Sequence, residues 1–371
     1  MTGDTPRDPV TPSAAAPGAP VPAAGALVPV VPAAAGAPDS AGTIGPDRLD
    51  PAARPFVELL TAVFPDVGGA VTDPAEARRI LAAAPAVPGE PPAVGAVEEG
   101  VIPGPPGAPG LPVRVYRPPG GPGPRPTVVF LHGGGWVLCG PDTHDRTCRS
   151  LCRESGAVVV SVDYRLAPEA RFPAAVEDAY AAVRWAAAHI DHLGGAPDAL
   201  VVAGDSAGGN LAAAAALLAR ERGGPALAGQ VLLYPATDLA GSPASYRTNG
   251  QGYYLTTTHM RWYRDHYLGP DGDPRHPLAS PLRAEPAGLP PAHVLTAGCD
   301  PLCDEGRAFA AALRDAGVPV TEDHRPGMFH GFLALSGYLE EAADALSRAA
   351  DAIASMRQDR KNSGDQGGHT G

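Results

Sequence analysis

One pentapeptide, Gly204-Asp205-Ser206-Ala207-Gly208, constrains the fold of this 371-residue chain more than any other segment. The apolar residues 199–203 before it are typical of a buried strand, and an alanine-rich stretch typical of a helix follows it. A serine on such a tight strand-to-helix turn presents its hydroxyl above the sheet, and the flanking glycines let neighbouring backbone pass close by. Gly-x-Ser-x-Gly is a weak motif in a chain with 46 glycines, so the interpretation needs a second signal.

That second signal is the run His132-Gly133-Gly134-Gly135-Trp136, which directly follows the apolar strand pattern 127–131. Acyl transfer builds negative charge on a carbonyl oxygen, and fixed N–H donors stabilise that charge by roughly 3 to 4 kcal/mol each. A flexible turn is the alternative interpretation of a glycine run. Beside a nucleophile turn we predict an oxyanion hole formed by the N–H groups of Gly133, Gly134 and Ala207. We interpret His132 as a structural residue that orients this loop.

A serine nucleophile needs a histidine to accept its proton and a carboxylate to orient that histidine. In α/β-hydrolases the order along the chain is serine, acid, histidine. After Ser206, the strand pattern 292–299 ends directly at Asp300, and the carboxyl ends of parallel strands are where sites collect. We therefore predict Asp300 as the acid. Asp304 and Glu305 follow at the start of a helix, where carboxylates commonly cap the helix or complement its dipole.

Three histidines follow Asp300, namely His324, His330 and His369. His369 lies in a polar, glycine-rich tail, and His324 lies within the alternating strand pattern 318–325. His330 follows that pattern in residues 326–332, a segment that we expect to be a loop with space for an imidazole to move. His330 is therefore the predicted base.

Together these motifs resemble the hormone-sensitive-lipase family of α/β-hydrolases over roughly residues 46 to 355. The resemblance rests on five segments in the same order, which are 132–136, 163–174, 204–209, 300–306 and 330–332. It implies the triad Ser206, Asp300 and His330, with Gly133, Gly134 and Ala207 as the oxyanion hole. It also implies a helical cap that N-terminal helices complete.

The resemblance implies an α/β-hydrolase fold. The alternation of strand and helix patterns predicts a mostly parallel central sheet with helices on both faces, in agreement with that fold. Strand patterns lie at 111–118, 127–131, 158–164, 199–205, 229–235, 292–299 and 319–325. Helical patterns include 172–189, 210–222 and 305–316. The catalytic domain is expected at 96–357, with a cap insertion at about 238–290 that has no strand pattern. Cap helices are expected within 46–95, at 51–64 and 74–84.

Aromatic residues of the insertion have two interpretations. They either line the acyl pocket or form the small core of the cap, and their helical spacing favours packing. The set consists of Tyr253, Tyr254, Trp262, Tyr263 and Tyr267.

Residues 1–45 and 358–371 are expected to be disordered, because their composition cannot bury enough surface to offset chain entropy. The first segment lacks a basic start and proline interrupts its apolar runs, so we do not interpret it as a signal peptide. Uninterrupted apolar stretches of about 18 residues are absent from the sequence, so no membrane span is expected. These features predict a cytoplasmic protein.

Charge and lysine content exclude several function classes. The formal net charge is −12 and no basic stripe is present, so nucleic acid is not an expected partner. The only lysine, Lys361, lies in the C-terminal tail. Schiff-base enzymes, Walker-type phosphate loops and Ser-x-x-Lys enzymes all need a lysine in the folded region.

Metal binding is not expected either. Cys148 and Cys152 are four residues apart, as are Cys299 and Cys303, and a zinc site formed by these four thiols is the alternative to free, buried cysteines. Neither pair has the Cys-x-x-Cys spacing usual in structural zinc sites, so free thiols are favoured. His189 and His192 fit the end of a helix, where histidine complements the dipole. We expect no metal and no cofactor.

The predicted function is a serine carboxylesterase that acts on small-molecule esters with short to medium acyl groups. Amide bonds need the same triad, so a deacetylase or amidase of a secondary metabolite is an alternative. A non-catalytic receptor on the same scaffold is a second alternative, which the presence of His330 disfavours. The sequence leaves the oligomeric state open, with a homodimer as one option.

Overall fold

The computed structural model describes residues 48–84, 89–120 and 123–364, with backbone alone from 357 onward. Its strands are β1 (Ala96–Ile102), β2 (Leu111–Arg117), β3 (Arg125–Leu131), β4 (Val158–Val162), β5 (Gly195–Asp205), β6 (Gly229–Leu233), β7 (Ala292–Cys299) and β8 (Val320–Phe329). Its α-helices are α1 (Arg54–Val63), α2 (Pro74–Ala83), α3 (Asp145–Ser155), α4 (Ala174–Ala188), α5 (Ala207–Glu221), α6 (Ala244–Thr248), α7 (Thr257–Leu268), α8 (Cys303–Asp315) and α9 (Glu340–Gly364). Short 3₁₀ turns lie at Pro281–Arg283 and Phe332–Leu335.

The described strands form one sheet in the order β1-β2-β4-β3-β5-β6-β7-β8. β2 runs antiparallel to both of its neighbours, and every pairing from β4 to β8 is parallel. This confirms the predicted α/β-hydrolase fold. The sequence patterns missed β1, an edge strand that leaves Val97 and Val101 exposed and carries Glu98 and Glu99, so it lacks a clear apolar alternation.

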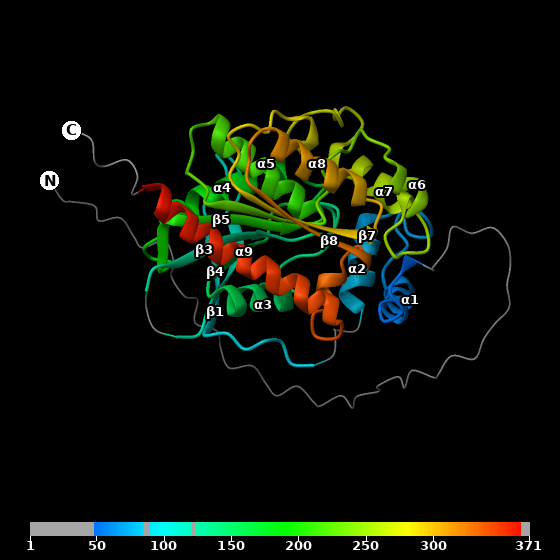
Figure 1. Ribbon diagram of the computed structural model, residues 1–371. Helices are drawn as coiled ribbons and strands as arrows, with labels where there is room; N and C mark the ends of the chain where they lie inside the picture. Colours follow the sequence, from blue (N-terminus) through cyan, green and yellow to red (C-terminus); the bar gives the residue numbers. More distant parts are fainter. Residues whose placement is uncertain (1–47, 85–88, 121–122, 365–371) are drawn as a thin grey trace, which may run out of the picture.

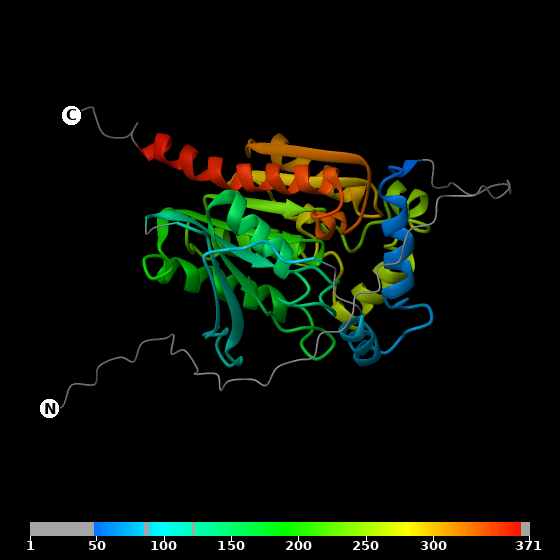
Figure 2. The same cartoon turned by 90° about the horizontal axis from the view of Figure 1, so that it is seen from below.

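Helices cover both faces of the sheet (Figures 1 and 2). α4, α5 and α8 lie on one face, and α3 and α9 lie side by side on the other. Two apolar clusters fill the layers, because alternate β5 side chains point to opposite faces. Val202 belongs to the cluster under α4 and α5, whereas Val201 and Ala203 belong to the cluster under α3 and α9. No helix of the described residues is long and apolar enough to span a membrane.

Four helices, α1, α2, α6 and α7, gather beyond one end of the sheet (Figure 1). We refer to α1, α2 and residues 238–290 together as the cap. Its parts are joined by the Trp262 indole N–H, which donates to the Thr72 carbonyl at 3.0 Å, and by an edge contact of Phe64 with Tyr254. Four of the five aromatic residues singled out in the insertion are buried, while Tyr254 is half-buried, which favours packing as their main role.

Two predicted boundaries differ from the structure. The strand that holds His324 continues through Pro326 and Gly327 to Phe329, so this stretch is not the loop that proline and glycine suggested. A register shift opposite Gly298 explains the difference, because a bulge accommodates both residues within a strand. Helix α9 extends to Gly364, so residues 358–364 of the predicted tail are helical. The predicted tail 1–45 lies outside the described residues, as do residues 365–371.

Candidate active site

Ser206 lies at the turn between β5 and α5 in a strained backbone conformation, with φ 56° and ψ −119°. Its N–H donates to the Leu233 carbonyl of β6 at 2.8 Å, which holds the turn against the neighbouring strand. A Cβ on Gly208 would collide with the carbonyl oxygens of Leu131 and His132, and one on Gly204 would collide with the Gly208 carbonyl. The two glycines are therefore required by close backbone approach, as the motif predicted.

His330, directly after β8, joins Ser206 to Asp300, directly after β7. Its Nε2 lies 2.9 Å from Ser206 Oγ, and its Nδ1 lies 2.7 Å from Asp300 Oδ2. Asp300 is fully buried, and its second oxygen accepts the Leu302 N–H at 2.8 Å. An ionised carboxylate only accepts, so Nδ1 carries the proton and Nε2 is free to accept from the serine hydroxyl. The structure thus brings together the three predicted residues.

His324 lies elsewhere, with its Nδ1 2.9 Å from Thr296 Oγ1 in the β7–β8 pair. His369 lies outside the described residues. Asp304 and Glu305 lie in the first turn of α8, where a carboxylate complements the helix dipole, but neither of them caps the helix. Asp304 accepts the Ser245 N–H at 2.8 Å, and Glu305 binds the segment after β6. Both carboxylates thus fix the insertion to α8, because the helix start lies beside the segments that lead into the cap.

The glycine run after β3 requires a correction to the predicted oxyanion donors. The Gly133 N–H donates to Asp205 Oδ1 at 2.9 Å, so it is already engaged and is not a free donor. In contrast, the N–H groups of Gly134 and Gly135 have no hydrogen bond to any other described residue. Gly134 and Gly135 have φ values of 110° and 60°, which glycine adopts without strain. Ala207 begins α5, where helical N–H groups have no partner within the helix.

Asp205 and His132 contact the oxyanion loop and hold its backbone in place. His132 is fully buried and stacks on Tyr164, whose hydroxyl donates to the His132 carbonyl at 2.7 Å. Burial lowers the pKa of His132 to about 3, so its ring is neutral. These contacts agree with the structural interpretation of His132. Asp205 lies against a further imidazole, His144, with the ring Nε2 3.2 Å from Asp205 Oδ1.

Sequence reasoning did not identify His144. His144 lies within residues 141–145 and immediately precedes α3, a helix that was not among the predicted ones. A histidine soon after a glycine-rich oxyanion motif is the only signal that was available. Glu305 was identified only as a helix-start carboxylate, although it is buried.

A cavity of about 290 Å³ lies between the oxyanion loop and the insertion. Its lining includes Trp136, which follows Gly135, and one face of α7. The other wall, residues 239–242, continues from Ala236, whose N–H donates to the Ser206 carbonyl at 3.2 Å. No triad residue lines the cavity, which is connected to the serine turn through this segment and through Trp136 at the end of the oxyanion loop.

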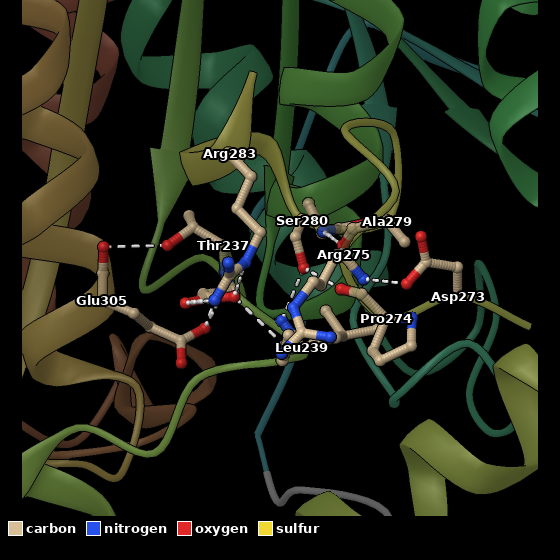
Figure 3. A network of polar contacts seen from close by, with 12 residues as sticks. Thr237, Leu239, Asp273, Pro274, Arg275, Ala279, Ser280, Arg283 and Glu305 are labelled. Atoms are coloured by element: carbon tan, nitrogen blue, oxygen red, sulfur yellow. Dashed lines mark hydrogen bonds and ion pairs between the residues drawn. The ribbon is translucent and has the colours of Figure 1, made fainter.

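A buried polar network fixes this second wall (Figure 3). Glu305 Oε1 accepts the Thr237 and Asp238 N–H groups at 2.7 and 3.2 Å, and the Thr237 hydroxyl donates to the Glu305 carbonyl at 2.8 Å. Ser280 Oγ accepts the Leu239 N–H at 2.8 Å. Burial raises the pKa of Glu305 to about 8, against the opposite effect of the two backbone donors. The network connects α8 with the insertion.

The cysteines and the histidines at the end of α4 were considered as possible metal ligands. Four of the five cysteines are buried and Cys139 is half-buried, all without disulfides. In the described part of the chain, no group of three or more His, Cys, Asp or Glu residues is arranged to hold a metal ion. His189 ends α4 and stacks on Trp185, in agreement with its interpretation as a helix terminus, whereas His192 lies in the turn that follows the helix.

The strand order and the serine turn define an α/β-hydrolase. A family model described as alpha/beta hydrolase fold matches residues 128–334, more than half of the chain. The chain belongs to this family, and its predicted membership of the hormone-sensitive-lipase family of α/β-hydrolases is confirmed.

Several named relatives are similar to this chain over much of its sequence. The carboxylic ester hydrolase LipN of Mycobacterium tuberculosis is 49% identical over 241 residues, 63% of this chain and 63% of LipN, so the match spans less than two thirds of that relative. An ethyl acetate hydrolase of Pseudomonas putida is 39% identical over 252 residues, 66% of this chain and 78% of the relative. Among solved structures, a hyperthermophilic esterase of the archaeon Pyrobaculum calidifontis superposes with a TM-score of 0.75 at 42% identity, covering 83% of this chain and 98% of that chain.

Proposed function

We propose that this protein is a serine carboxylesterase that hydrolyses small-molecule esters with short to medium acyl chains. The observation that carries the proposal is the hydrogen-bonded chain from Ser206 Oγ through His330 to the buried Asp300, at 2.9 and 2.7 Å. The names of the relatives, which include a carboxylic ester hydrolase and an ethyl acetate hydrolase, support the substrate class.

In the proposed reaction, Ser206 Oγ attacks the ester carbonyl carbon while His330 Nε2 accepts the hydroxyl proton. The tetrahedral intermediate collapses when the bond to the alkoxy group breaks, and His330 returns the proton to the leaving alcohol. Water then attacks the acyl-serine by the same steps in reverse, which releases the acid. Asp300 stays ionised throughout and holds the imidazole with Nε2 toward the serine.

Negative charge on the intermediate oxygen needs donors that are free in the resting enzyme. We assign these to the N–H groups of Gly134, Gly135 and Ala207, because the Gly133 N–H already binds Asp205. Removal of one such donor lowers kcat by about 10²- to 10³-fold.

Short acyl chains are proposed because the cavity beside Trp136 is bounded by Leu239, Met260 and Tyr246. Each buried methylene contributes about 0.8 kcal/mol, so kcat/KM should rise with length until the chain meets this wall. The cap, which we propose closes over the serine, provides the wall. Amide bonds require the same triad, so acetylated amines belong in the substrate screen.

We also propose that the protein is cytoplasmic, and cell fractionation tests this location.

The test is hydrolysis of p-nitrophenyl esters of two to sixteen carbons, below their micelle concentrations, by wild type and Ser206→Ala. Wild type should prefer acyl chains of about two to eight carbons, and the variant should lose at least about 10³-fold in kcat/KM with an unchanged melting temperature. Ser355→Ala, which changes an exposed serine of α9, is the matched control and should behave as wild type. Equal activity in Ser206→Ala would contradict the proposed nucleophile, and a maximum at twelve carbons or more would contradict the proposed chain length.

A further inference from the structure

The Asp205 carboxylate poses an electrostatic problem for the proposed reaction. It lies one residue before the nucleophile, its side chain is only 11% exposed, and it accepts the Gly133 N–H at 2.9 Å. A poorly solvated negative charge at this position opposes the formation of a second negative charge on the reacting carbonyl oxygen. The positive charge that His330 gains during the proposed reaction is matched by the Asp300 carboxylate, so the charge of Asp205 is left for another cation to offset.

His144 is placed to supply that charge. Its Nε2 lies 3.2 Å from Asp205 Oδ1 and 3.3 Å from Oδ2, and its side chain is 14% exposed. Its Nδ1 lies 2.9 Å from Thr143 Oγ1. The single hydroxyl proton of Thr143 goes to the Gly140 carbonyl at 2.8 Å, so this oxygen accepts from Nδ1–H. Nε2 faces both Asp205 oxygens and, at 3.3 Å, the Gly133 N–H. That N–H has its shorter contact, 2.9 Å, with Asp205 Oδ1. With the N–H directed to Asp205, Nε2 donates to the carboxylate, both ring nitrogens act as donors, and the ring is an imidazolium.

The groups around His144 leave Asp205 as its charge partner. Its ring lies 5.6 Å from the ring of His132, which burial keeps neutral, and 6.2 Å from the ring of Phe130. Burial raises the pKa of the Cys139 thiol to about 12, so that thiol is neutral as well. The next residue, Asp145, is paired with Arg149 at 2.7 Å. Burial acts to lower the pKa of His144, but the charge of Asp205 raises it above the ordinary value of 6.5.

We propose that protonated His144 is a positioning residue that holds the Asp205 carboxylate against the oxyanion loop and cancels its negative charge during acyl transfer. Asp205 then orients the Gly133 peptide, and the Gly133 peptide sets the direction of the Gly134 and Gly135 N–H groups. The inference rests on the proposed function, because it assigns a role within the same reaction. His144 touches neither substrate nor nucleophile and acts only through Asp205.

The kinetic test compares His144→Gln with wild type, alone and in an Asp205→Asn background. The glutamine can still donate a hydrogen bond but carries no charge. In the Asp205 enzyme it should lower kcat by about 10- to 100-fold with little change in KM, as expected for a misplaced or uncompensated oxyanion site. In the Asp205→Asn enzyme the same change should cost less than about threefold, because no carboxylate charge remains to be cancelled.

The pH profile separates charge from shape. Wild-type kcat should fall on the alkaline side as His144 loses its proton, with a midpoint above 6.5. His144→Gln should lack this alkaline limb and keep the rest of the wild-type profile. Additive effects in the double-variant cycle, or an alkaline limb that persists in His144→Gln, would overturn the proposal.

A spectroscopic measurement keeps the inference testable if a variant fails to fold or if the protein hydrolyses no ester. In the ¹H–¹⁵N spectrum of wild-type histidine side chains at pH 7, one ring should have both nitrogens protonated. That signal should disappear in His144→Gln. In Asp205→Asn, the pKa of the His144 ring should be lower than in wild type. A neutral His144 at pH 7 would overturn the ion pair even in an active esterase. Absence of ester turnover with an intact imidazolium signal would instead contradict the proposed function.

Discussion

The carboxyl edge of the sheet carries Ser206 and the cap helices lie beyond one end of the sheet, but different forces determine the structures of these two regions. At the sheet edge, backbone geometry determines where the catalytic groups lie. Gly208 has no Cβ and so allows the Leu131 carbonyl to approach, and Ser206 adopts a positive φ at the turn. In the cap, side-chain packing decides the arrangement, as where the Tyr263 ring covers Gly135 and Trp262 joins α7 to the loop before α2.

This difference separates chemistry from selectivity. Backbone requirements are local and allow few residue types, so the catalytic groups should tolerate almost no substitution. Packing in the cap can be satisfied by several apolar residues, so changes there should alter the preferred substrate before they abolish the reaction.

The largest effect should come from exchanging histidines at the sheet edge. His330→Ala should lower kcat/KM by at least about 10⁴-fold, because Ser206 loses its base, whereas His324→Ala should stay within about threefold of wild type. Both are measured with p-nitrophenyl acetate. Loss of activity in His324→Ala with retention in His330→Ala would show that the base is misassigned.

Gly208→Ala tests the backbone requirement itself. The added methyl group would collide with the Leu131 and His132 carbonyls, so the free energy of unfolding should fall by about 3 kcal/mol or more. Gly123→Ala, at a position with open space and no positive φ, should change stability by less than about 0.5 kcal/mol. Urea denaturation measures both variants, and similar stabilities would argue against a rigid turn.

In the cap, Leu239→Ala should change selectivity more than catalysis. Leu239 is buried and lines the cavity, so its truncation should move the acyl-length optimum upward by about two carbons. It should also cost about 2 to 3 kcal/mol of stability. An unchanged length profile would place the acyl chain elsewhere.

The smallest effect should appear in the pH dependence of stability. With a pKa of about 8 against an ordinary 4.5, Glu305 keeps its proton in the folded protein and loses it on unfolding between these pH values. Raising the pH through this window therefore lowers the free energy of unfolding, by about 2 kcal/mol between pH 6 and 8. Glu305→Gln should remove this dependence, and an equally steep decline in the variant would assign it to another group.

The contrast between the two regions also explains how much the sequence could predict. Ser206 and Asp300 were predictable because each directly follows a strand pattern, and His330 because few histidines follow the acid in the chain order that the fold imposes. The donor set was not, because the direction of the Gly133 peptide depends on a carboxylate 72 residues away. His144 and Glu305 act through equally remote contacts, and β1 lacks an apolar alternation, so local patterns do not reveal them.

The central claim is that Ser206 forms an acyl intermediate, and rapid acid quenching of the reaction with p-nitrophenyl acetate tests it most directly. Intact-protein mass spectrometry should show one added acetyl group in the first turnover, and peptide mapping should locate it within residues 204–208. Ser206→Ala should remain unmodified under the same conditions. An acetyl group on another residue, or turnover that Ser206→Ala retains, would contradict the account.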